Sequence, residues 1–495
     1  MANTTPRGGE HALATAGTDH LNFIRGEFVP APPSQGRIAV INPATGEVVG
    51  TVPESSAEEV DAALLAAEAA QEAWAARPAV ERAKILHAIA NNIRDRKLDL
   101  ARTITEEQGK TLGLAEVEVN FTADYIDYMA EWARRLEGEI LQSDRPGETI
   151  LLFRHPIGVV VGILPWNFPF FLIARKVAPA LITGNTIVVK PSEETPLNAV
   201  KFCELLAGTG LPPGVINVIH GRGSSVGSAL SSSPRAGLIT FTGSVESGSK
   251  IMAAAAANIT RVNLELGGKA PAIVMADADI DLAVKAVQAS RILNSGQVCN
   301  CAERVYVQSK IAPEFTDKLA KSMQSVHFGN PLEDSSVEYG PLINEKAFRK
   351  VDRLVQSAVK EGATLITGGA RGPGDRGYYY QPTVLSGCRQ DMEITRTEIF
   401  GPVVPIIPFD DLDQAIRFAN DSDYGLTSSI YTRDLNVALK ACRQIRFGET
   451  YINRENFEAM QGFHAGWRKS GIGGADGKHG LYEFMQTHVV YLQSY

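Results

Sequence analysis

The stretch VVVGILPWNFP, from Val159 to Pro169, decides how the chain folds. It opens with a short apolar run, Val159–Leu164, that predicts a strand, and PWNFP then separates this strand from a helix. Further apolar strands are predicted at residues 186–190, 215–219, 238–241 and 262–265, with helical segments between them. This alternation is typical of a doubly wound parallel sheet in an α/β protein.

Segments on both sides of this run carry other patterns. Ser55 opens a capping box with Glu58 before a long amphipathic helix, and a second helical region covers residues 79–136. The turn sequence SDRPGE predicts a hairpin, whose apolar side needs a partner. A second α/β run covers residues 270–451, and the last strand is predicted at residues 487–492. Residues 1–20 are expected to form a flexible arm.

Composition limits the class of protein. A length of 495 residues suggests about three domains. The net charge of -8 argues against nucleic acid or an anionic membrane as partner. There is no run of 18 apolar residues for a membrane span, and the N-terminus lacks the apolar core of a signal peptide. Five scattered cysteines indicate a reducing, cytoplasmic compartment rather than a disulfide framework: Cys203, Cys299, Cys301, Cys388 and Cys442.

One of these cysteines stands where a nucleophile is expected. The segment NSGQVCNCAER places Cys299 in a small polar loop between a helix (Ile280 to Val287) and a strand (Glu303 to Val307). Cys301 makes a CxC pair with it, but no second cysteine pair or histidine cluster accompanies the two. We therefore interpret Cys301 as a packing residue and expect no metal.

Three further segments accompany this loop: PWNFP with Asn167, LELGGKAP with Glu265, and EIFGP with Glu398 and Phe400. With these four segments in this order, the chain resembles the aldehyde dehydrogenase superfamily from about Phe23 to its C-terminus. The interval of 34 positions from Glu265 to Cys299 matches the family's spacing between general base and nucleophile.

The resemblance implies both an architecture and a mechanism. It implies a cofactor-binding domain (residues 21–138 and 159–267), a catalytic domain (268–481) and an oligomerisation element (139–158 and 482–495). The exposed edges of that element would pair with a neighbouring subunit, giving a homo-oligomer, either a dimer or a homotetramer. Cys299 would attack an aldehyde, with the Asn167 amide and the Cys299 N–H stabilising the oxyanion. Glu265 would activate water to hydrolyse the resulting thioester.

The cofactor is expected at one of two glycine-rich stretches. GRGSSVG (221–227) lacks the ending of a phosphate loop, whereas FTGSVESG (241–248) follows a strand and opens a helix. Lys190 and Glu193 lie at and just after the end of the strand predicted at residues 186–190. A carboxylate at this point accepts hydrogen bonds from the ribose hydroxyls and repels a 2′-phosphate, which favours NAD over NADP. By resemblance the cofactor residues are Trp166, Lys190, Glu193, Gly243, Ser244, Gly248, Glu398 and Phe400.

The expected substrate pocket is polar where many relatives are aromatic. Arg175, Asn300, Glu458 and His464 line it by position, which suits a small hydroxyaldehyde such as lactaldehyde or glycolaldehyde. The segments 121–140 and 453–471 resemble the bacterial lactaldehyde dehydrogenases. Where many relatives have a proton-relay glutamate, this chain has Ala475 with Asp476 beside it.

Several alternatives stay open at this point. Glu458 and His464 would, in one of them, pair with each other and only shape the wall. Succinate-semialdehyde dehydrogenases use an arginine like Arg175 to hold a carboxylate, although Glu458 argues against one here. Other relatives are non-catalytic structural proteins or transfer the acyl group to coenzyme A. Cys299, Asn167 and Glu265 together speak against the structural proteins, and Glu265 speaks against acyl transfer.

Overall fold

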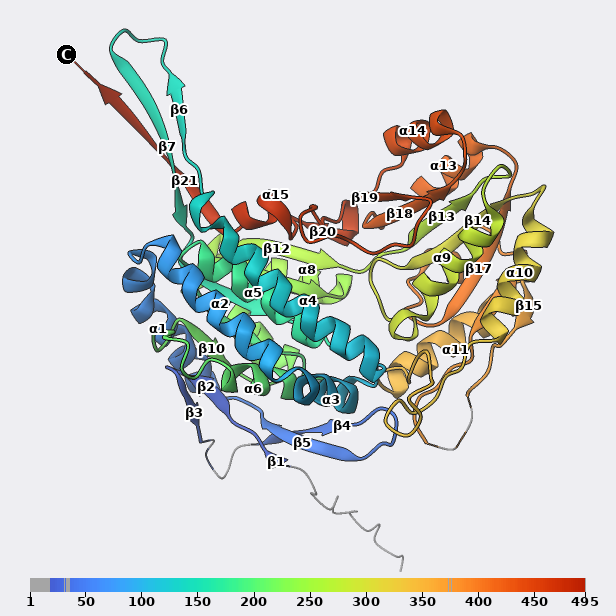
Figure 1. Cartoon of the computed structure of the whole chain (residues 1–495), viewed down its shortest axis with the longest axis horizontal. Coiled ribbons are helices and arrows are strands. Elements are labelled where there is room, and N and C mark those ends of the chain that lie inside the picture. The colour runs from blue at the N-terminus through green and yellow to red at the C-terminus, as the bar shows by residue number, and fades with distance from the viewer. Residues whose placement is uncertain (1–17, 31, 33–35, 373, 375, 495) are drawn as a thin grey trace, which may run out of the picture.

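A computed structural model describes residues 18–30, 32, 36–372, 374 and 376–494 (Figure 1). Residues 1–17 of the predicted arm lie outside these described residues. The arm prediction is wrong for its next two residues, because Thr18–Asp19 forms strand β1, parallel to β5 (Val48–Pro53). Thr51 Oγ1 fixes this pairing by donating to the Asp19 carboxylate at 2.6 Å. β4 (Arg37–Ile41) completes the three-stranded sheet.

The largest sheet has eight strands in the order β20-β12-β11-β8-β9-β10-β2-β3. Its central five are parallel: β8 (Val159–Ile163), β9 (Thr186–Lys190), β10 (Ile216–Val218), β11 (Leu238–Gly243) and β12 (Arg261–Leu266). These confirm the five predicted strands. One edge carries β2 (Asn22–Ile24) and β3 (Glu27–Val29), and the other carries β20 (Gly471–Ile472). β20 comes from the segment predicted as catalytic domain, so that boundary does not follow the sheet.

The winding of this sheet reverses beside β8. After β8 the chain builds β9 and β10 on one side, then crosses over to add β11 and β12 on the other. In open parallel sheets, ligands bind at the carboxyl ends of the strands at such a switch point. PWNFP follows β8 and Ser244 follows β11, so two predicted site segments meet there.

Helices cover both faces of the sheet, because alternate strand residues point to opposite sides. Val160 packs with residues of α2, α4 and α5, whereas Val159 and Val161 pack with residues of α1 and α8. The helices of this part are α1 (Ala57–Ala75), α2 (Ala79–Asp95), α3 (Lys97–Gln108), α4 (Leu112–Ala130), α5 (Pro169–Ile182), α6 (Leu197–Glu204), α7 (Ser228–Ser231) and α8 (Val245–Ala255), with short turns η1 (Glu131–Arg134), η2 (Gly223–Gly227) and η3 (Ala256–Asn258).

Two helix predictions need correction. The capping box of α1 uses Ser56 and Glu59, one residue later than predicted. Ser55 is buried and hydrogen-bonded to Asn22, so its hydroxyl is not free to cap the helix. The helical region 79–136 is divided into several helices, and Gly109, with a φ of 88°, ends α3 in the left-handed conformation.

The second α/β run, predicted at residues 270–451, forms a seven-stranded sheet in the order β15-β16-β17-β14-β13-β18-β19. Its strands are β13 (Ala270–Val274), β14 (Ala302–Gln308), β15 (Thr364–Thr367), β16 (Thr383–Ser386), β17 (Val403–Phe409), β18 (Thr427–Tyr431) and β19 (Glu449–Ile452). Its helices are α9 (Ile280–Ile292), α10 (Ala312–Gln324), α11 (Glu345–Lys360), α12 (Glu393–Arg396), α13 (Leu412–Asn420) and α14 (Leu435–Gln444). Two short turns also occur here: η4 (Leu293–Gly296) follows α9, and η5 (Arg468–Ser470) follows β19.

The predicted hairpin, β6 (Glu139–Gln142) and β7 (Glu148–Pro156), projects from the body (Figure 1). Its partner is the C-terminal strand β21 (Met485–Gln493), which follows α15 (Gly477–Tyr482) and pairs antiparallel with β7. Apolar side chains remain exposed on this small sheet, among them Ile140, Phe153 and Tyr491. Within the described part of the chain, no helix has both the length and the apolar character to cross a membrane.

Candidate active site

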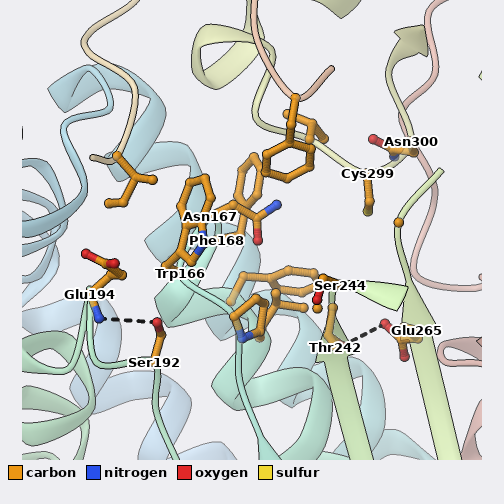
Figure 2. Close-up of a pocket in the computed structure, with 18 of the residues that line it drawn as sticks. Trp166, Asn167, Phe168, Ser192, Glu194, Thr242, Ser244, Glu265, Cys299 and Asn300 are labelled. Atoms are coloured by element: carbon orange, nitrogen blue, oxygen red, sulfur yellow. Dashed lines mark hydrogen bonds between the residues drawn. The ribbon is translucent and has the colours of Figure 1, made fainter. Parts of the chain in front are cut away.

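A cavity of about 650 Å³ lies at the carboxyl ends of β8 and β11, lined also by segments of the second α/β part (Figure 2). It gathers predicted site residues that are far apart in the sequence. These are Trp166, Asn167, Arg175, Glu193, Gly243, Ser244, Glu265, Cys299, Asn300, Glu398, Phe400, Glu458 and His464. Lys190 and Gly248 do not line the cavity.

The Cys299 loop begins with a strained turn. Asn294, Ser295 and Gly296 have φ angles of 48°, 60° and 74°, which side chains other than glycine disfavour. Buried hydrogen bonds hold the turn: the Asn294 amide donates to the Asn167 carbonyl at 3.0 Å, and the Ser295 hydroxyl donates to the Gly340 carbonyl at 2.8 Å. These buried hydrogen bonds hold the turn in its strained conformation, and the turn fixes the position of the Cys299 loop.

Cys301 differs from Cys299 in its surroundings. Cys299 is partly exposed, whereas Cys301 is buried, with Nη1 of Arg291 2.7 Å from its sulfur. Burial raises the pKa of the Cys301 thiol to about 12 although Arg291 opposes the shift. A thiol that stays protonated is a packing group, which supports our interpretation of Cys301. Among the residues that the structure describes, no group of His, Cys, Asp or Glu is arranged to hold a metal ion.

Asn167 is held from both sides. Its side-chain Nδ2 donates to the Gln297 carbonyl at 3.1 Å, and its own carbonyl accepts from Lys110 Nζ at 2.7 Å. Lys110 is buried and paired with Glu118 at 2.6 Å. The other Glu118 oxygen accepts two N–H groups of the first turn of α5, at 2.9 and 3.0 Å. The amide therefore points one N–H at the Cys299 loop with little freedom to move.

Glu265, at the end of β12, is buried rather than solvated. Its carboxylate accepts from Lys176 Nζ at 3.1 Å and from Thr242 Oγ1 at 3.2 Å, and Arg175 Nη1 lies 3.7 Å away. The Thr242 contact is drawn in Figure 2. Burial by itself raises the pKa of Glu265, but Lys176, Arg175 and His464 together lower it to about 2. In this arrangement Glu265 is a stable carboxylate.

Arg175 anchors a polar wall beside Cys299. Its guanidinium donates to both carboxylate oxygens of buried Asp476, one of them at 3.0 Å, and to Glu458 at 3.2 Å. Glu458 also accepts from the side-chain amide of Asn300. Asp476 thus supports the wall through Arg175, and it has a φ of 70°, a conformation that disfavours any residue but glycine.

His464 does not pair with Glu458. Its Nδ1 lies 2.5 Å from the carboxylate of Glu449, the first residue of β19. The alternative in which Glu458 and His464 bind each other is therefore wrong, because each has its own partner. The backbone of His464 is fixed as well, through N–H···O bonds of 2.9 and 2.8 Å with Ala475 in both directions.

The other half of the cavity is lined by segments that the sequence predicts to bind the cofactor. Ser244 caps α8 by accepting the Ser247 N–H at 3.2 Å, so the N-terminus of α8 opens onto the cavity, as FTGSVESG predicted. Glu193 lies 3.4 Å from buried Lys190 Nζ, which places Lys190 behind the cavity wall. A Cβ on Gly248 would come within 2.6 Å of the Leu266 side chain, so this glycine serves close packing of α8 on β12. The competing stretch GRGSSVG forms η2, bonded to Glu54, outside the cavity lining.

Glu398 and Phe400 border this half of the cavity from the opposite side. Glu398 accepts the Gly268 N–H at 2.9 Å, and burial raises its pKa to about 6. A Cβ on Gly267 would lie 2.7 Å from the same carboxylate, and a Cβ on Gly268 would lie 2.6 Å from the Cys299 carbonyl oxygen, so both positions require glycine. The rings of Phe400 and Trp166 meet edge to face, with centroids 5.5 Å apart.

Comparison with known proteins fits this geometry. The model of the aldehyde dehydrogenase family matches residues 31–490. The chain belongs to the aldehyde dehydrogenase family. It is 61% identical over 475 residues to the lactaldehyde dehydrogenase of Escherichia coli (strain K12), covering 96% of this chain and 99% of that protein. It is 41% identical to the 3,6-anhydro-alpha-L-galactose dehydrogenase of Vibrio sp. (strain EJY3), covering 95% and 98%.

Solved structures give the same result. The crystal structure of lactaldehyde dehydrogenase from Escherichia coli has a TM-score of 0.95 with this aldehyde dehydrogenase, at 60% identity, and covers 97% of this chain and 100% of that one. The resemblance noted from the sequence is thus confirmed. As a family member, the protein is an oxidoreductase that converts aldehydes to acids with a nicotinamide cofactor, NAD(P). Asn167, Glu265 and Cys299 also line one cavity, which speaks against the non-catalytic alternative.

The sequence did not single out several residues that build the site of this aldehyde dehydrogenase. Buried Glu303 accepts the N–H groups of Ile399 and Phe400 at 2.8 and 3.0 Å and binds Lys269 at 2.7 Å, so it fixes the EIFGP loop. Lys110, Glu118, Lys176 and Glu449 were also missed. Each is a charged residue, and only the fold reveals that it is paired and largely or wholly buried.

Proposed function

We propose that this aldehyde dehydrogenase oxidises small 2-hydroxyaldehydes, lactaldehyde and glycolaldehyde, to the corresponding acids with NAD. The observation that carries the proposal is the polar wall beside Cys299, in which Arg175, Asn300 and Glu458 are joined by hydrogen bonds. A hydroxyl on the carbon next to the aldehyde can bind these groups, whereas an alkyl chain would desolvate them without replacing their partners. The high identity to a lactaldehyde dehydrogenase supports the same substrate class.

In the proposed reaction the Cys299 thiolate adds to the aldehyde carbon, and the carbonyl oxygen becomes an alkoxide. The second N–H of the Asn167 amide and the Cys299 backbone N–H stabilise this alkoxide, and loss of one such donor typically costs about 2.7–4 kcal/mol of barrier. A nicotinamide cofactor, when bound, would supply the acceptor for the hydride that leaves the carbon as the alkoxide collapses. A thioester on Cys299 remains, and water must cleave it.

Glu265 is the proposed base for that water. With a pKa near 2 while it touches Lys176, Glu265 is a weak proton acceptor. We infer that hydrolysis takes place after Glu265 has turned away from Lys176 towards the thioester. Proximity supports this step, because Glu265 and Cys299 line the same cavity (Figure 2).

The proposed cofactor residues are Trp166, Gly243, Ser244, Glu398 and Phe400, with Lys190 supporting Glu193 and Gly248 supporting α8. Glu193 presents a carboxylate at the carboxyl edge of the sheet, where NAD offers two ribose hydroxyls and NADP a 2′-phosphate. Hydrogen bonds from those hydroxyls favour NAD, and charge repulsion disfavours NADP.

Succinate-semialdehyde oxidation is the second candidate, because Arg175 stands where a substrate carboxylate would need a cation. In the structure, however, that guanidinium already binds the carboxylates of Asp476 and Glu458. Glu265 also lies 3.7 Å from the same guanidinium, so a substrate carboxylate would be the fourth negative charge around it and would add repulsion. The geometry therefore favours the hydroxyaldehyde.

We also propose the larger organisation on the same grounds. The two large sheets support a division into cofactor-binding and catalytic domains, with the boundary adjusted at β20. The exposed apolar side chains of β6, β7 and β21 support an oligomer, a dimer or tetramer, formed through that sheet. All five cysteines are free, which supports a cytoplasmic location.

A panel of aldehydes tests the substrate class. Lactaldehyde, glycolaldehyde, propanal, acetaldehyde and succinate semialdehyde are compared by the rate of NADH formation, and kcat/KM is determined for each. We expect the two hydroxyaldehydes to exceed propanal and acetaldehyde. If succinate semialdehyde gives the highest kcat/KM, the hydroxyaldehyde proposal fails and Arg175 binds a substrate carboxylate.

A further inference from the structure

Glu449 is a largely buried acid that lies behind the active site and does not line the cavity. Its side chain is 14% exposed, and its carboxylate contacts Nδ1 of His464 at 2.5 Å. The other carboxylate oxygen accepts the hydroxyl of Tyr451, two residues further along β19. The acid therefore has two fixed partners, and only His464 reaches the cavity.

Several other charged or titratable groups face His464 besides Glu449. The Cys299 side chain interacts with the imidazole, and the charges of Arg175, Glu265 and Asp476 act on it or on its partners. Burial and Arg175 disfavour a charged ring, whereas Glu449 and Cys299 favour it. The net effect is a pKa of His464 well above its usual value, with Glu449 as the largest contribution in that direction.

The protonation of this ring decides what it can offer to a substrate. An imidazole bound to a carboxylate through Nδ1–H has only a lone pair at Nε2 when it is neutral. An imidazolium carries a hydrogen on both nitrogens and can donate from Nε2 into the cavity. In the polar wall, Glu458 can accept the proton of a substrate hydroxyl, but the hydroxyl oxygen also needs a donor.

We propose that Glu449 is a positioning residue that holds His464 as a two-hydrogen donor next to Cys299, so that the ring donates to the hydroxyl oxygen of a 2-hydroxyaldehyde. Glu449 thereby determines specificity without touching the substrate. This inference rests on the proposed hydroxyaldehyde function. The competing explanation is that Glu449 only braces β19 against the loop that carries His464.

The test uses the intact enzyme and the ratio of kcat/KM for lactaldehyde to that for propanal, measured from about pH 6 to pH 9. The Glu449→Gln variant keeps the size of the side chain and a hydrogen-bonding amide but removes the charge. Burial and Arg175 then act on His464 unopposed by Glu449, so the ring loses its second hydrogen as the pH rises. We expect the ratio to approach the wild-type value only towards the acid end and to fall roughly tenfold at the alkaline end, as for loss of a charged hydrogen bond.

Two further variants separate positioning from bracing. Glu449→Asp keeps the charge and should keep the wild-type pH profile, even if the rate is lower. In a His464→Gln background, Glu449→Gln should cause no further change in the ratio, because Glu449 acts only through the ring. If Glu449 only braces β19, Glu449→Gln should instead lower kcat/KM for lactaldehyde and for propanal by the same factor at every pH, with or without His464.

The inference is overturned if the ratio in Glu449→Gln follows the wild-type profile, or if the two substrates lose activity in parallel. It is also overturned if Glu449→Gln changes the ratio in the His464→Gln background. These outcomes differ from failure of the proposed function, which would appear in the wild type as a lack of preference for lactaldehyde over propanal.

Discussion

Replacing Glu458 by glutamine removes one negative charge from the polar wall and keeps the shape of the side chain. In the wild type, Glu458 binds Arg175 at 3.2 Å and Asn300, and a substrate hydroxyl would add a third hydrogen bond to the same carboxylate. Hydrogen bonds to charged groups contribute about 1.5–3 kcal/mol and those between neutral groups about 0.5–1.5 kcal/mol. The substitution should therefore cost about 1–1.5 kcal/mol with lactaldehyde, roughly 5- to 13-fold in kcat/KM.

The assay is NADH formation with lactaldehyde, propanal and succinate semialdehyde on the same preparation. Propanal has no hydroxyl, so the ratio of lactaldehyde to propanal should fall by the full factor. The kcat/KM for succinate semialdehyde should rise, because Arg175 loses one of the carboxylates that compete with the substrate for its guanidinium. Glu455→Gln is the matched control, since Glu455 lies three residues earlier, exposed and paired with Arg454. If the ratio changes no more in Glu458→Gln than in this control, the assignment of the polar wall as the hydroxyl site is refuted.

Four other substitutions probe the chemistry. Cys299→Ala should abolish turnover and leave NAD affinity, measured by fluorescence titration, nearly unchanged; turnover within tenfold of wild type would exclude it as nucleophile. Glu265→Gln should release about one equivalent of NADH per active site in rapid mixing and then stall, and an unchanged steady state would contradict its role as base. Lys176→Gln removes the nearest cation from Glu265, so the pKa of that acid rises; turnover should then decline at a higher pH than in the wild type as the solution is acidified, and superimposable pH profiles would count against the coupling. Glu193→Gln should narrow the gap in kcat/KM between NAD and NADP, and a constant ratio would mean that another residue reads the ribose.

The sequence predicted the parts of the site that depend on local order. The strands around PWNFP, the helix after Ser244 and the loop of Cys299 follow from apolar runs, caps and turns, and each appears within about two residues of its expected place. The winding of the sheet then brings their ends together by a general rule of parallel sheets.

The sequence could not predict which partner each charged side chain finds. Local patterns place Glu458 and His464 in one segment, six residues apart, but they do not show that Glu449 takes the histidine and Arg175 takes the glutamate. Likewise, Ser55 and Ser56 are equivalent candidates for the helix cap in the sequence. Only the fold shows that Asn22, more than thirty residues earlier, hydrogen-bonds the hydroxyl of Ser55. Long-range pairing of buried polar groups depends on the finished fold.

The edge strand β20 has a consequence for how the chain is made. It contributes only Gly471 and Ile472, yet it closes the edge of β12 next to Glu265. During synthesis, the N-terminal half emerges with this edge unpaired, and its last strand arrives some 200 residues later. The sequence separation between β7 and its partner strand β21 is larger still. Neither sheet can be completed until almost the whole polypeptide has left the ribosome. Unpaired strand edges are therefore exposed during translation and can associate with other chains, so early folding of the N-terminal half gives little protection.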